Sequence, residues 1–583
     1  MTAREKYEIW KAQVPADSPI AGELLALEAN EEEITARFLG DLTFGTAGLR
    51  GIMGAGTDRM NVYTVRRAAV AYGSYIKRTP ELADSCAIAY DTRNNSRLFS
   101  EVCATALAEQ GLHVYLYPDP APTPMLSFAV RHLKTGGGVV MTASHNPAPY
   151  NGMKCYGDDG CQQTDEPAAE VYAIMQKLPM ILEAGASFEA LVAGGSIELI
   201  GQEVYDSYYA AVLAQSLHPE IIPQSGLKLL YTPLHGTGLT PVTELFDRLG
   251  VSYDLVSSQT TPDGNFPTCP YPNPETAPAF NEAVKVLSAP GAPDYDLVVA
   301  TDPDADRMAV AIPQKASDGS ITLRRLSGNE FGCILLDYIL DVRSRESTLP
   351  AAPKAIKSIV TTPMVYAVAS NYGCQTVDVL TGFKYIGSTI LELERQGRED
   401  EVVFAFEESC GFLKGTYVRD KDAQVASILV AELAAVCKTK GISLAQQMDR
   451  LYDRYGWYKN QVVSIDLDGE AGKKLCADFI DSLRGQPLPE LAGLKVERIS
   501  DYLNSVSTDC LTGQKEKLDF PPSNVLSYQM GASGQAILRP SGTEPKLKVY
   551  FFASAGSEAD ADALLTRLVE DVQSRMRAFG VLK

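Results

Sequence analysis

A serine within the segment TASHNPAPYNGMK, residues 142–154, has the surroundings of a possible nucleophile. The preceding TGGGVVM predicts an apolar strand that ends near Ser144, and ligands usually bind at strand ends in open α/β sheets. A serine hydroxyl is a poor nucleophile unless a base, a metal or an attached phosphate helps it. His145 follows directly, and Lys154 lies further along the same segment. Taken alone, Ser-His-Asn-Pro is more often a capping turn than a catalytic site.

Three aspartates stand between two apolar strands in the segment YDLVVATDPDADRMAVAI, residues 295–312. Asp302, Asp304 and Asp306 would repel one another in a tight loop, and a divalent cation among them would offset that cost. Hard oxygen ligands, too few for a calcium cage, favour Mg²⁺ with a phosphate oxygen completing its shell. The glycine and the terminal glutamate of an EF-hand loop are missing. An Asp-rich turn without a metal is the alternative interpretation.

A third polar segment, FAFEESCGF at residues 404–412, carries a carboxylate and a hydroxyl two positions apart. On an extended loop Glu407 and Ser409 would face the same way and could bridge neighbouring sugar hydroxyls. A helix N-terminus in which glutamate complements the dipole explains the same residues. Just upstream, TGFKYIG adds Lys384, which could meet a phosphate or sugar oxygen.

The fourth segment, LRPSGTEPKLKVY at residues 538–550, groups a guanidinium, hydroxyls and a glycine between prolines. A fork of N–H donors beside free backbone amides suits a dianionic phosphate. A plain, rigid turn is the alternative. The candidate phosphate ligands are Arg539, Ser541, Gly542 and Thr543.

Bulk composition excludes several classes of protein. The chain has 583 residues, 45% hydrophobic and 21% charged, with a formal net charge of −21. Such acidity argues against nucleic acid or an anionic membrane as the main partner, but not against a phosphorylated small molecule. The charged N-terminus does not resemble a secretory signal, and the apolar run 426–437 contains Glu432 and predicts a buried helix rather than a membrane span. Eleven scattered cysteines indicate reduced thiols, so we expect a cytoplasmic protein.

One strand–loop–helix–strand pattern occurs three times along the chain. The copies begin at CAIAYDTRNNS, LKLLYTPLHGT and IKSIVTTPMVY, and their helices end near Gly111, Gly250 and Gly373. Each copy predicts a βαβ-like crossover in a mixed or parallel sheet. After Tyr458 the pattern changes to strands followed by one helix, which predicts a smaller α+β domain, and the first forty residues predict a helical lead-in.

We therefore expect three related α/β domains with mixed sheets and a C-terminal α+β domain, arranged around a central cleft. The predicted domains are residues 1–220 with the Ser144 loop, 221–328 with the aspartate loop, 329–458 with the Glu407 loop and 459–583 with the Arg539 loop.

The four polar segments, in this order, resemble motifs of the α-D-phosphohexomutase superfamily. The matching stretches are TASHNP, DPDADR, EESCG and RPSGTEP, and FGTAGLRG at residues 44–51 is a fifth match. The resemblance covers nearly the whole chain. FGTAGLRGIMGAG and TGFKYIG are most similar to the phosphoglucomutase-2 and phosphopentomutase branch, whereas Glu408 and Cys410 differ from other branches.

The resemblance implies a phosphoserine enzyme. Ser144 would donate and recover the phosphoryl group, and its phosphate would join Asp302, Asp304 and Asp306 around Mg²⁺. Lys154 would be the general base, and His145 would orient the loop or touch substrate. The other implied roles are phosphoryl stabilisation by Arg50 and Arg307, binding of the sugar hydroxyls by Glu407 and Ser409, and distal phosphate binding by Arg539, Ser541, Gly542 and Thr543.

On this basis we expect a mutase that interconverts glucose 1-phosphate and glucose 6-phosphate, with glucose 1,6-bisphosphate as intermediate and activator. A phosphopentomutase acting on ribose or deoxyribose phosphates and a sugar-bisphosphate synthase are alternatives within the same fold. A metal-dependent phosphatase, which also pairs serine with aspartates, is an alternative of another class. A phosphosugar-binding protein without activity is a further one.

Overall fold

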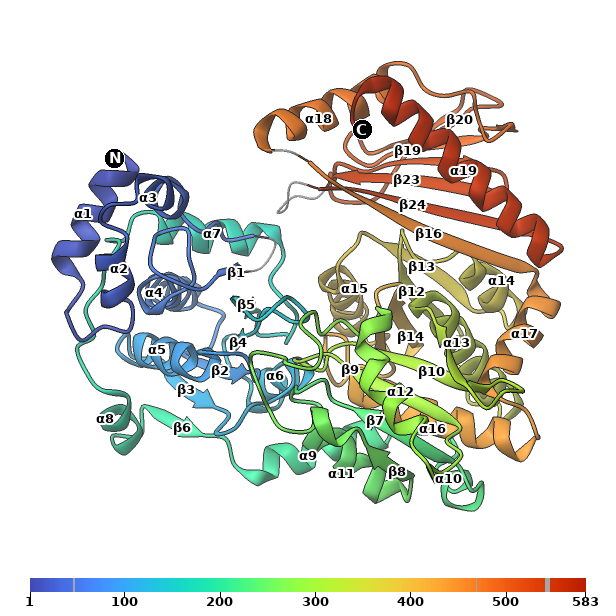
Figure 1. The fold of residues 1–583 in the computed structure, drawn as a ribbon, viewed down its shortest axis with the longest axis horizontal. Helices are drawn as coiled ribbons and strands as arrows, with labels where there is room; N and C mark the ends of the chain where they lie inside the picture. The colour runs from blue at the N-terminus through green and yellow to red at the C-terminus, as the bar shows by residue number, and fades with distance from the viewer. Residues whose placement is uncertain (46–47, 468, 541–545, 583) are drawn as a thin grey trace. The chain divides into compact units, whose positions relative to one another are not determined.

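The computed structural model describes residues 1–45, 48–467, 469–540 and 546–582 (Figure 1). The chain forms two compact units. The first comprises Met1–Lys354 and Gly382–Ala445, and the second comprises Ala355–Thr381 and Gln446–Lys583.

The first unit begins with a helical lead-in, as predicted. Three short helices enclose a small apolar core in which Tyr7, Trp10 and Phe38 are almost fully buried. The rings of Tyr7 and Trp10 both meet Phe38 edge to face at 5.7 Å. These helices are α1 (Ala3–Gln13), α2 (Ala21–Ala26) and α3 (Glu31–Phe38).

A six-stranded mixed sheet follows, in the order β1-β5-β4-β2-β3-β6. Strands β2, β3, β4 and β6 are parallel, whereas β5 runs antiparallel to both β4 and β1. The strands are β1 (Gly48–Ile52), β2 (Ser85–Tyr90), β3 (His113–Leu116), β4 (Gly138–Met141), β5 (Tyr150–Tyr156) and β6 (Ile197–Leu199). The accompanying helices are α4 (Val62–Arg78), α5 (Ser96–Ala108), α6 (Thr123–Leu133), α7 (Asp165–Met175), α8 (Phe188–Ala193) and α9 (Gln202–Leu213).

A second mixed sheet has the order β11-β10-β9-β7-β8. The parallel strands β8, β7 and β9 give way to the antiparallel hairpins β9–β10 and β10–β11. Its elements are α10 (Ile221–Gln224), β7 (Lys228–Thr232), α11 (Leu239–Leu249), β8 (Ser252–Leu255), α12 (Asn281–Leu287), β9 (Leu297–Thr301), β10 (Met308–Lys315) and β11 (Ile321–Leu326). Every side chain of β9 is buried, as expected of a strand with both faces covered.

Further elements of the first unit include the antiparallel pair β14 (Val402–Glu407) and β15 (Gly411–Leu413). The helices are α13 (Gly328–Arg345), α15 (Phe383–Arg395) and α16 (Ala423–Thr439). Helix α16 confirms the buried helix predicted from the apolar run 426–437. Its fully buried Glu432 accepts hydrogen bonds from the Tyr338 hydroxyl, at 2.6 Å, and from the Leu217 N–H. In the described part of the chain no helix is long and apolar enough to cross a membrane.

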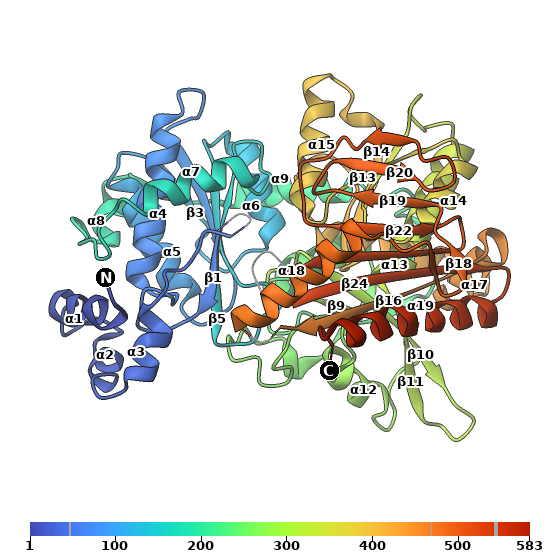
Figure 2. The same cartoon turned by 90° about the horizontal axis from the view of Figure 1, so that it is seen from above.

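The second unit contains an antiparallel sheet in the order β16-β24-β23-β22-β19-β20-β21. Helix α19 packs on β24 and β16, and Leu568 and Met576 on it are fully buried (Figure 2). The unit contains β12 (Lys354–Ser358, from Ala355 on), α14 (Met364–Asn371), β13 (Gln375–Val379), most of α17 (Leu444–Tyr455), β16 (Trp457–Asp466), α18 (Gly469–Gly485), β17 (Glu490–Leu491), β18 (Leu494–Lys495), β19 (Arg498–Asp501), β20 (Val506–Asp509), β21 (Lys515–Lys517), β22 (Leu526–Met530), β23 (Gly534–Pro540), β24 (Lys546–Ala555) and α19 (Glu558–Phe579).

These elements confirm the predicted fold class. The three repeated patterns fold as β2–α5–β3, β7–α11–β8 and β12–α14–β13, and the first two pair their strands in parallel. Gly250 caps α11 in the left-handed conformation that the sequence predicted, with φ 67°. All eleven cysteines are free thiols, and Cys510 is the exposed one among them.

Tyr72 on α4 links two strands that lead to and from the Ser144 segment. Its buried hydroxyl donates to the Tyr156 carbonyl on β5, at 2.6 Å, and accepts the Gly138 N–H on β4, at 3.1 Å. Y72F removes both of these buried hydrogen bonds, so we expect a loss of about 1–3 kcal/mol in unfolding free energy. Urea denaturation followed by circular dichroism measures it. Y63F, which removes one partly buried hydrogen bond to Ser18, should cost less; equal midpoints for Y72F and wild type would contradict the assignment.

Candidate active site

Ser144 occupies a tight turn directly after β4, where its backbone is held in the left-handed region with φ 50°. The residue is 3% exposed. Its Oγ donates a hydrogen bond to Asp302 Oδ2 at 2.8 Å and lies 3.1 Å from His145 Nδ1. Burial, with the nearby charges of Arg307 and Arg50, lowers the pKa of His145 well below its usual value, so the imidazole is neutral.

The three aspartates line the turn between β9 and β10. Asp302 and Asp304 are fully buried, Asp306 is 2% exposed, and Ala305 between them adopts φ 46°. One carboxylate oxygen from each lies within 4.8 Å of the others. Burial and the charges of Asp304 and Asp306 raise the pKa of Asp302 well above its usual value. Burial opposes ionisation of Asp304 as well, but the Lys154 ammonium holds its pKa below the usual range.

Lysines from two distant segments lie against these acids. Lys154 Nζ on β5 donates to Asp304 Oδ2 at 2.9 Å and lies 3.6 Å from Asp306. Lys421 Nζ lies 2.9 Å from Asp306 Oδ2 and 3.1 Å from Asp420. Burial would lower the pKa of Lys421, but Asp306 and Asp420 raise it, so this ammonium stays charged. The site thus has several buried positive and negative groups within ion-pair distance.

The geometry of the aspartates fits a divalent metal ion. Asp304 Oδ1 and Asp306 Oδ1 are buried without a hydrogen-bond partner among the described residues. Such orphaned carboxylate oxygens are costly unless a cation takes them. Three hard oxygen donors are the ligands that Mg²⁺ prefers. Asp302, Asp304 and Asp306 could therefore hold Mg²⁺ beside Ser144.

The two arginines predicted to stabilise a phosphoryl group lie on separate elements. Arg307 follows the aspartate turn, and its guanidinium donates to Glu275 at 2.6 Å and lies 3.7 Å from Asp306. Arg50 lies on β1, whose register places it opposite Gly152, two residues before Lys154. Gly48 of the same strand has φ 150°, and a Cβ there would lie 1.9 Å from the Met153 carbonyl oxygen. Glycine is therefore required for β1 to approach β5 this closely.

The residues predicted to grip the sugar occupy a hairpin turn rather than an extended loop. Glu407 ends β14 and pairs with Gly411, so Ser409 lies in the tight turn between them. Glu407 accepts the Gly382 N–H at 2.7 Å, and burial raises its pKa against the opposing charge of Lys421. Lys384 donates to Asp165 at 2.6 Å, at the start of α7.

The predicted phosphate-binding segment is only partly described. Arg539 lies near the end of β23 in the second unit. Ser541, Gly542 and Thr543 lie outside the described residues.

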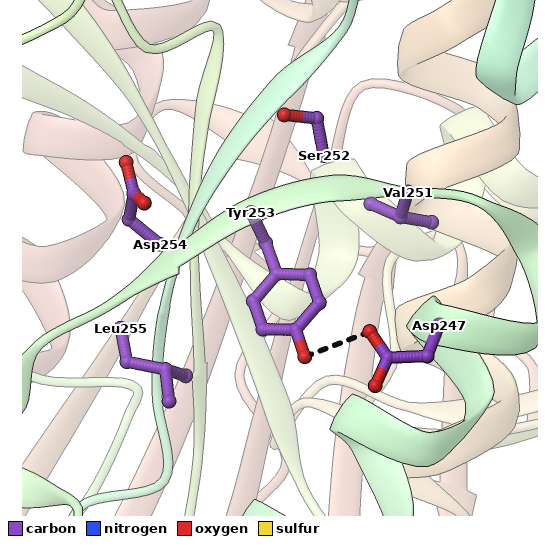
Figure 3. Close-up of a pocket in the computed structure, with 6 residues that line it drawn as sticks. All are labelled: Asp247, Val251, Ser252, Tyr253, Asp254 and Leu255. Carbon is purple, nitrogen blue, oxygen red and sulfur yellow. Dashed lines mark hydrogen bonds between the residues drawn. The ribbon is translucent and has the colours of Figure 1, made fainter.

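A shallow surface pocket elsewhere shares no residue with this constellation. It is formed by β8 and the end of α11, and Figure 3 shows the Tyr253 hydroxyl donating to Asp247, at 3.0 Å. The pocket carries two carboxylates and no basic side chain, so it does not suit a phosphate. Its lining residues are Asp247, Val251, Ser252, Tyr253, Asp254 and Leu255.

Four protein-family models match successive stretches of the chain. They describe the α/β/α domains I, II and III and the C-terminal domain of phosphoglucomutase/phosphomannomutase. The matched residues are 41–180, 206–315, 327–455 and 516–573. The chain belongs to the phosphoglucomutase/phosphomannomutase family.

Individual relatives agree with the family models. A phosphoglucomutase from Staphylococcus saprophyticus is 35% identical over 525 residues, which cover 89% of this chain and 92% of the relative. A phosphoglucomutase from Staphylococcus aureus is 35% identical over 516 residues, 88% of this chain and 90% of the relative. The crystal structure of the Paramecium phosphoglucomutase parafusin shares the fold, with a TM-score of 0.67 and 17% identity over 93% of this chain and 96% of that one.

In this member of the phosphoglucomutase/phosphomannomutase family, sequence reasoning missed two cations at the site, Lys421 and Arg93. Lys421 lies between two aspartates in RDKDA, and this charge alternation was its only signal in the sequence. Arg93 lies in the polar loop DTRNNS after β2, and its guanidinium donates to the Ser144 carbonyl. Nothing in that loop indicates that it folds back onto residues fifty positions away.

We predict that the aspartate turn binds Mg²⁺ in solution. Isothermal titration of the wild-type protein with MgCl₂ should show one site, and D302N should weaken it at least about 10-fold, because a buried anionic ligand is lost. D318N, in the exposed turn between β10 and β11, is the matched control and should bind like wild type. Equal Mg²⁺ affinity in D302N and wild type would refute the metal assignment.

Proposed function

We propose that this chain is a phosphoglucomutase that interconverts glucose 1-phosphate and glucose 6-phosphate through a phosphorylated Ser144. The observation that carries the proposal is the buried Ser144 hydroxyl, 2.8 Å from Asp302 within a triad of aspartates. A phosphate on this oxygen would lie beside a metal site and beside fixed cations, the environment that phosphoryl transfer requires. The relatives that cover most of the chain are phosphoglucomutases, which supports the same activity.

Asp302, Asp304 and Asp306 would hold Mg²⁺ together with the serine phosphate. When bound, Mg²⁺ supplies positive charge to the oxygens of the transferring phosphoryl group. Arg307 and Arg50 would add N–H donors and further charge to the same group. Burial of the aspartates excludes water, which strengthens each of these interactions.

In the first half-reaction the bond between Ser144 Oγ and phosphorus would break, and a bond from the sugar hydroxyl oxygen to phosphorus would form. Lys154 must first lose its own proton, and as a neutral amine it would accept the proton that this hydroxyl loses, because its Nζ lies 2.9 Å from Asp304 and hence beside the phosphoryl site. The product is glucose 1,6-bisphosphate. In the second half-reaction the other phosphate returns to Ser144, and Lys154 gives the proton back.

The neutral His145 would orient the turn or contact substrate, since its Nδ1 lies 3.1 Å from Ser144 Oγ. Glu407 and Ser409 would bind sugar hydroxyls from the β14–β15 turn. Lys384 would meet a phosphate or sugar oxygen. The phosphate that does not react would be bound by Arg539, Ser541, Gly542 and Thr543.

Three further proposals concern the substrate branch, the domain boundaries and the location of this chain. The segments FGTAGLRGIMGAG and TGFKYIG favour the phosphoglucomutase-2 and phosphopentomutase branch, so pentose phosphates are the second substrate class. We also propose the domain boundaries given above, near residues 220, 328 and 458, and a cytoplasmic location.

The first test removes the nucleophile. S144A should lower kcat for glucose 1-phosphate at least about 1,000-fold, because the variant loses the hydroxyl that is proposed to carry the phosphoryl group between half-reactions. A coupled assay of glucose 6-phosphate formation measures the rate, intact-mass spectrometry detects the added phosphate, and mass spectrometry of a digest locates it on residues 142–154. S74A, which removes a hydroxyl on α4 that donates to Gln110, is the control. Wild-type turnover in S144A would end the assignment.

The second test separates the substrate classes. We expect kcat/KM to be higher for glucose 1-phosphate than for ribose 1-phosphate or deoxyribose 1-phosphate in parallel assays. A preference for a pentose phosphate would move the chain to the phosphopentomutase branch. Release of inorganic phosphate at the rate of substrate consumption would instead indicate a phosphatase.

A further inference from the structure

Arg93 is a fully buried arginine that contacts the segment carrying Ser144 rather than the acids around it. The residue follows β2 in the loop DTRNNS, and its side chain is 0% exposed. A buried guanidinium is costly unless each of its donors is satisfied. The two terminal nitrogens of Arg93 donate to backbone carbonyl groups, and its Nε lies near the Asp91 carboxylate.

Four carbonyl groups of the segment 144–150 accept hydrogen bonds from Arg93. One terminal nitrogen of Arg93 donates to the Ser144 and Asn146 carbonyls, and the other donates to Pro147 at 3.0 Å and Tyr150 at 3.2 Å. The planar fork of a guanidinium can satisfy several acceptors at fixed angles, which the single ammonium of lysine cannot.

Both backbone polar groups of Ser144 are thereby held. Thr142 Oγ1 accepts the Ser144 N–H at 2.7 Å, and Arg93 donates to the Ser144 carbonyl. Ser144 itself has φ 50°, a left-handed conformation that costs a non-glycine residue about 1 kcal/mol or more. Such a conformation persists only where surrounding contacts impose it. Here these two hydrogen bonds act together with the bond from Ser144 Oγ to Asp302.

Arg93 is itself fixed from two sides. Its Nε lies 3.3 Å from Asp91 Oδ2, and Asp91 Oδ1 accepts the Arg93 N–H at 3.0 Å and the Ser96 hydroxyl at 2.7 Å. On the other side the guanidinium carbon lies 4.9 Å from the centre of the Phe266 ring. Phe266 lies in the segment between β8 and β9, which are strands of the second sheet, whereas Arg93 follows β2 of the first sheet. This cation–π contact therefore connects the two sheets.

We infer that Arg93 is a positioning residue for phosphoryl transfer, which fixes the direction of Ser144 Oγ by clamping the carbonyls of its turn. The inference rests on the proposed phosphoserine mechanism. In-line transfer requires the serine oxygen to keep its angle to the incoming hydroxyl, and a misplacement of about 1 Å can cost about 100-fold in rate. Arg93 touches neither substrate nor metal in this account and acts through the backbone of Ser144.

R93K tests the clamp while keeping a positive charge. We expect kcat for glucose 1-phosphate to fall about 100-fold with KM changed less than about 3-fold, since substrate contacts are untouched. We also expect faster amide hydrogen exchange in residues 142–154. R66K is the matched control, because Arg66 is a buried arginine that pairs with Glu109 and donates to the Glu183 carbonyl at 2.8 Å. It should leave kcat and exchange in 142–154 unchanged.

F266L removes the cation–π contact without altering Arg93, and it decides the question if R93K does not fold. A fall in kcat of at least about 3-fold with unchanged KM, together with faster exchange in 142–154, supports the clamp. The clamp is refuted if a folded R93K shows wild-type kcat or wild-type exchange in residues 142–154. If R93K does not fold, the same result in F266L refutes it. The activity of the wild-type protein is measured before that of the variants. If the wild-type protein has no mutase turnover, the proposed function is refuted separately, and hydrogen exchange in R93K still tests the clamp.

Discussion

The concentration of negative charge in the Asp302–Asp306 turn is the constraint on which the rest of the first unit depends. Three carboxylates in a water-poor turn cannot all be ionised unless positive charge surrounds them. The chain supplies that charge from distant positions, with Lys154 on β5 and Lys421 before α16. Because neither lysine is near the acids in sequence, the buried acids gain these partners only when β5 and the segment before α16 have packed around the turn.

Hydrogen bonds also connect the Ser144 turn to the aspartate turn. The Thr123 N–H donates to the Asp304 carbonyl, and the Thr123 hydroxyl donates to the Asp304 carboxylate, each at 2.9 Å. Ser144 bonds to Asp302. The start of α6 and the end of β4 therefore both contact one turn of the neighbouring sheet. Polar groups that would be costly to bury alone satisfy one another across this contact.

Sequence reasoning predicted the helices and strands better than it predicted the side-chain contacts between them. The repeated βαβ patterns, the buried α16 and the strands on both sides of the aspartates follow from hydrophobic periodicity and glycine positions, which are local properties. It also placed Ser144 at the end of a strand. The ion pairs of Lys421, the carbonyl contacts of Arg93 and the bond from Lys384 to Asp165 depend on tertiary packing. No local pattern encodes them, and the extended loop expected at Glu407 is a hairpin turn because β14 and β15 pair directly around it.

The distribution of thiols has a practical consequence. Ten of the eleven cysteines are buried, and Cys510, in the turn after β20, is exposed. A maleimide dye added to the native protein would therefore attach at Cys510, on the antiparallel sheet of the second unit. The fluorophore would report on the surroundings of that unit, while Ser144 and the buried groups around it stay chemically unmodified.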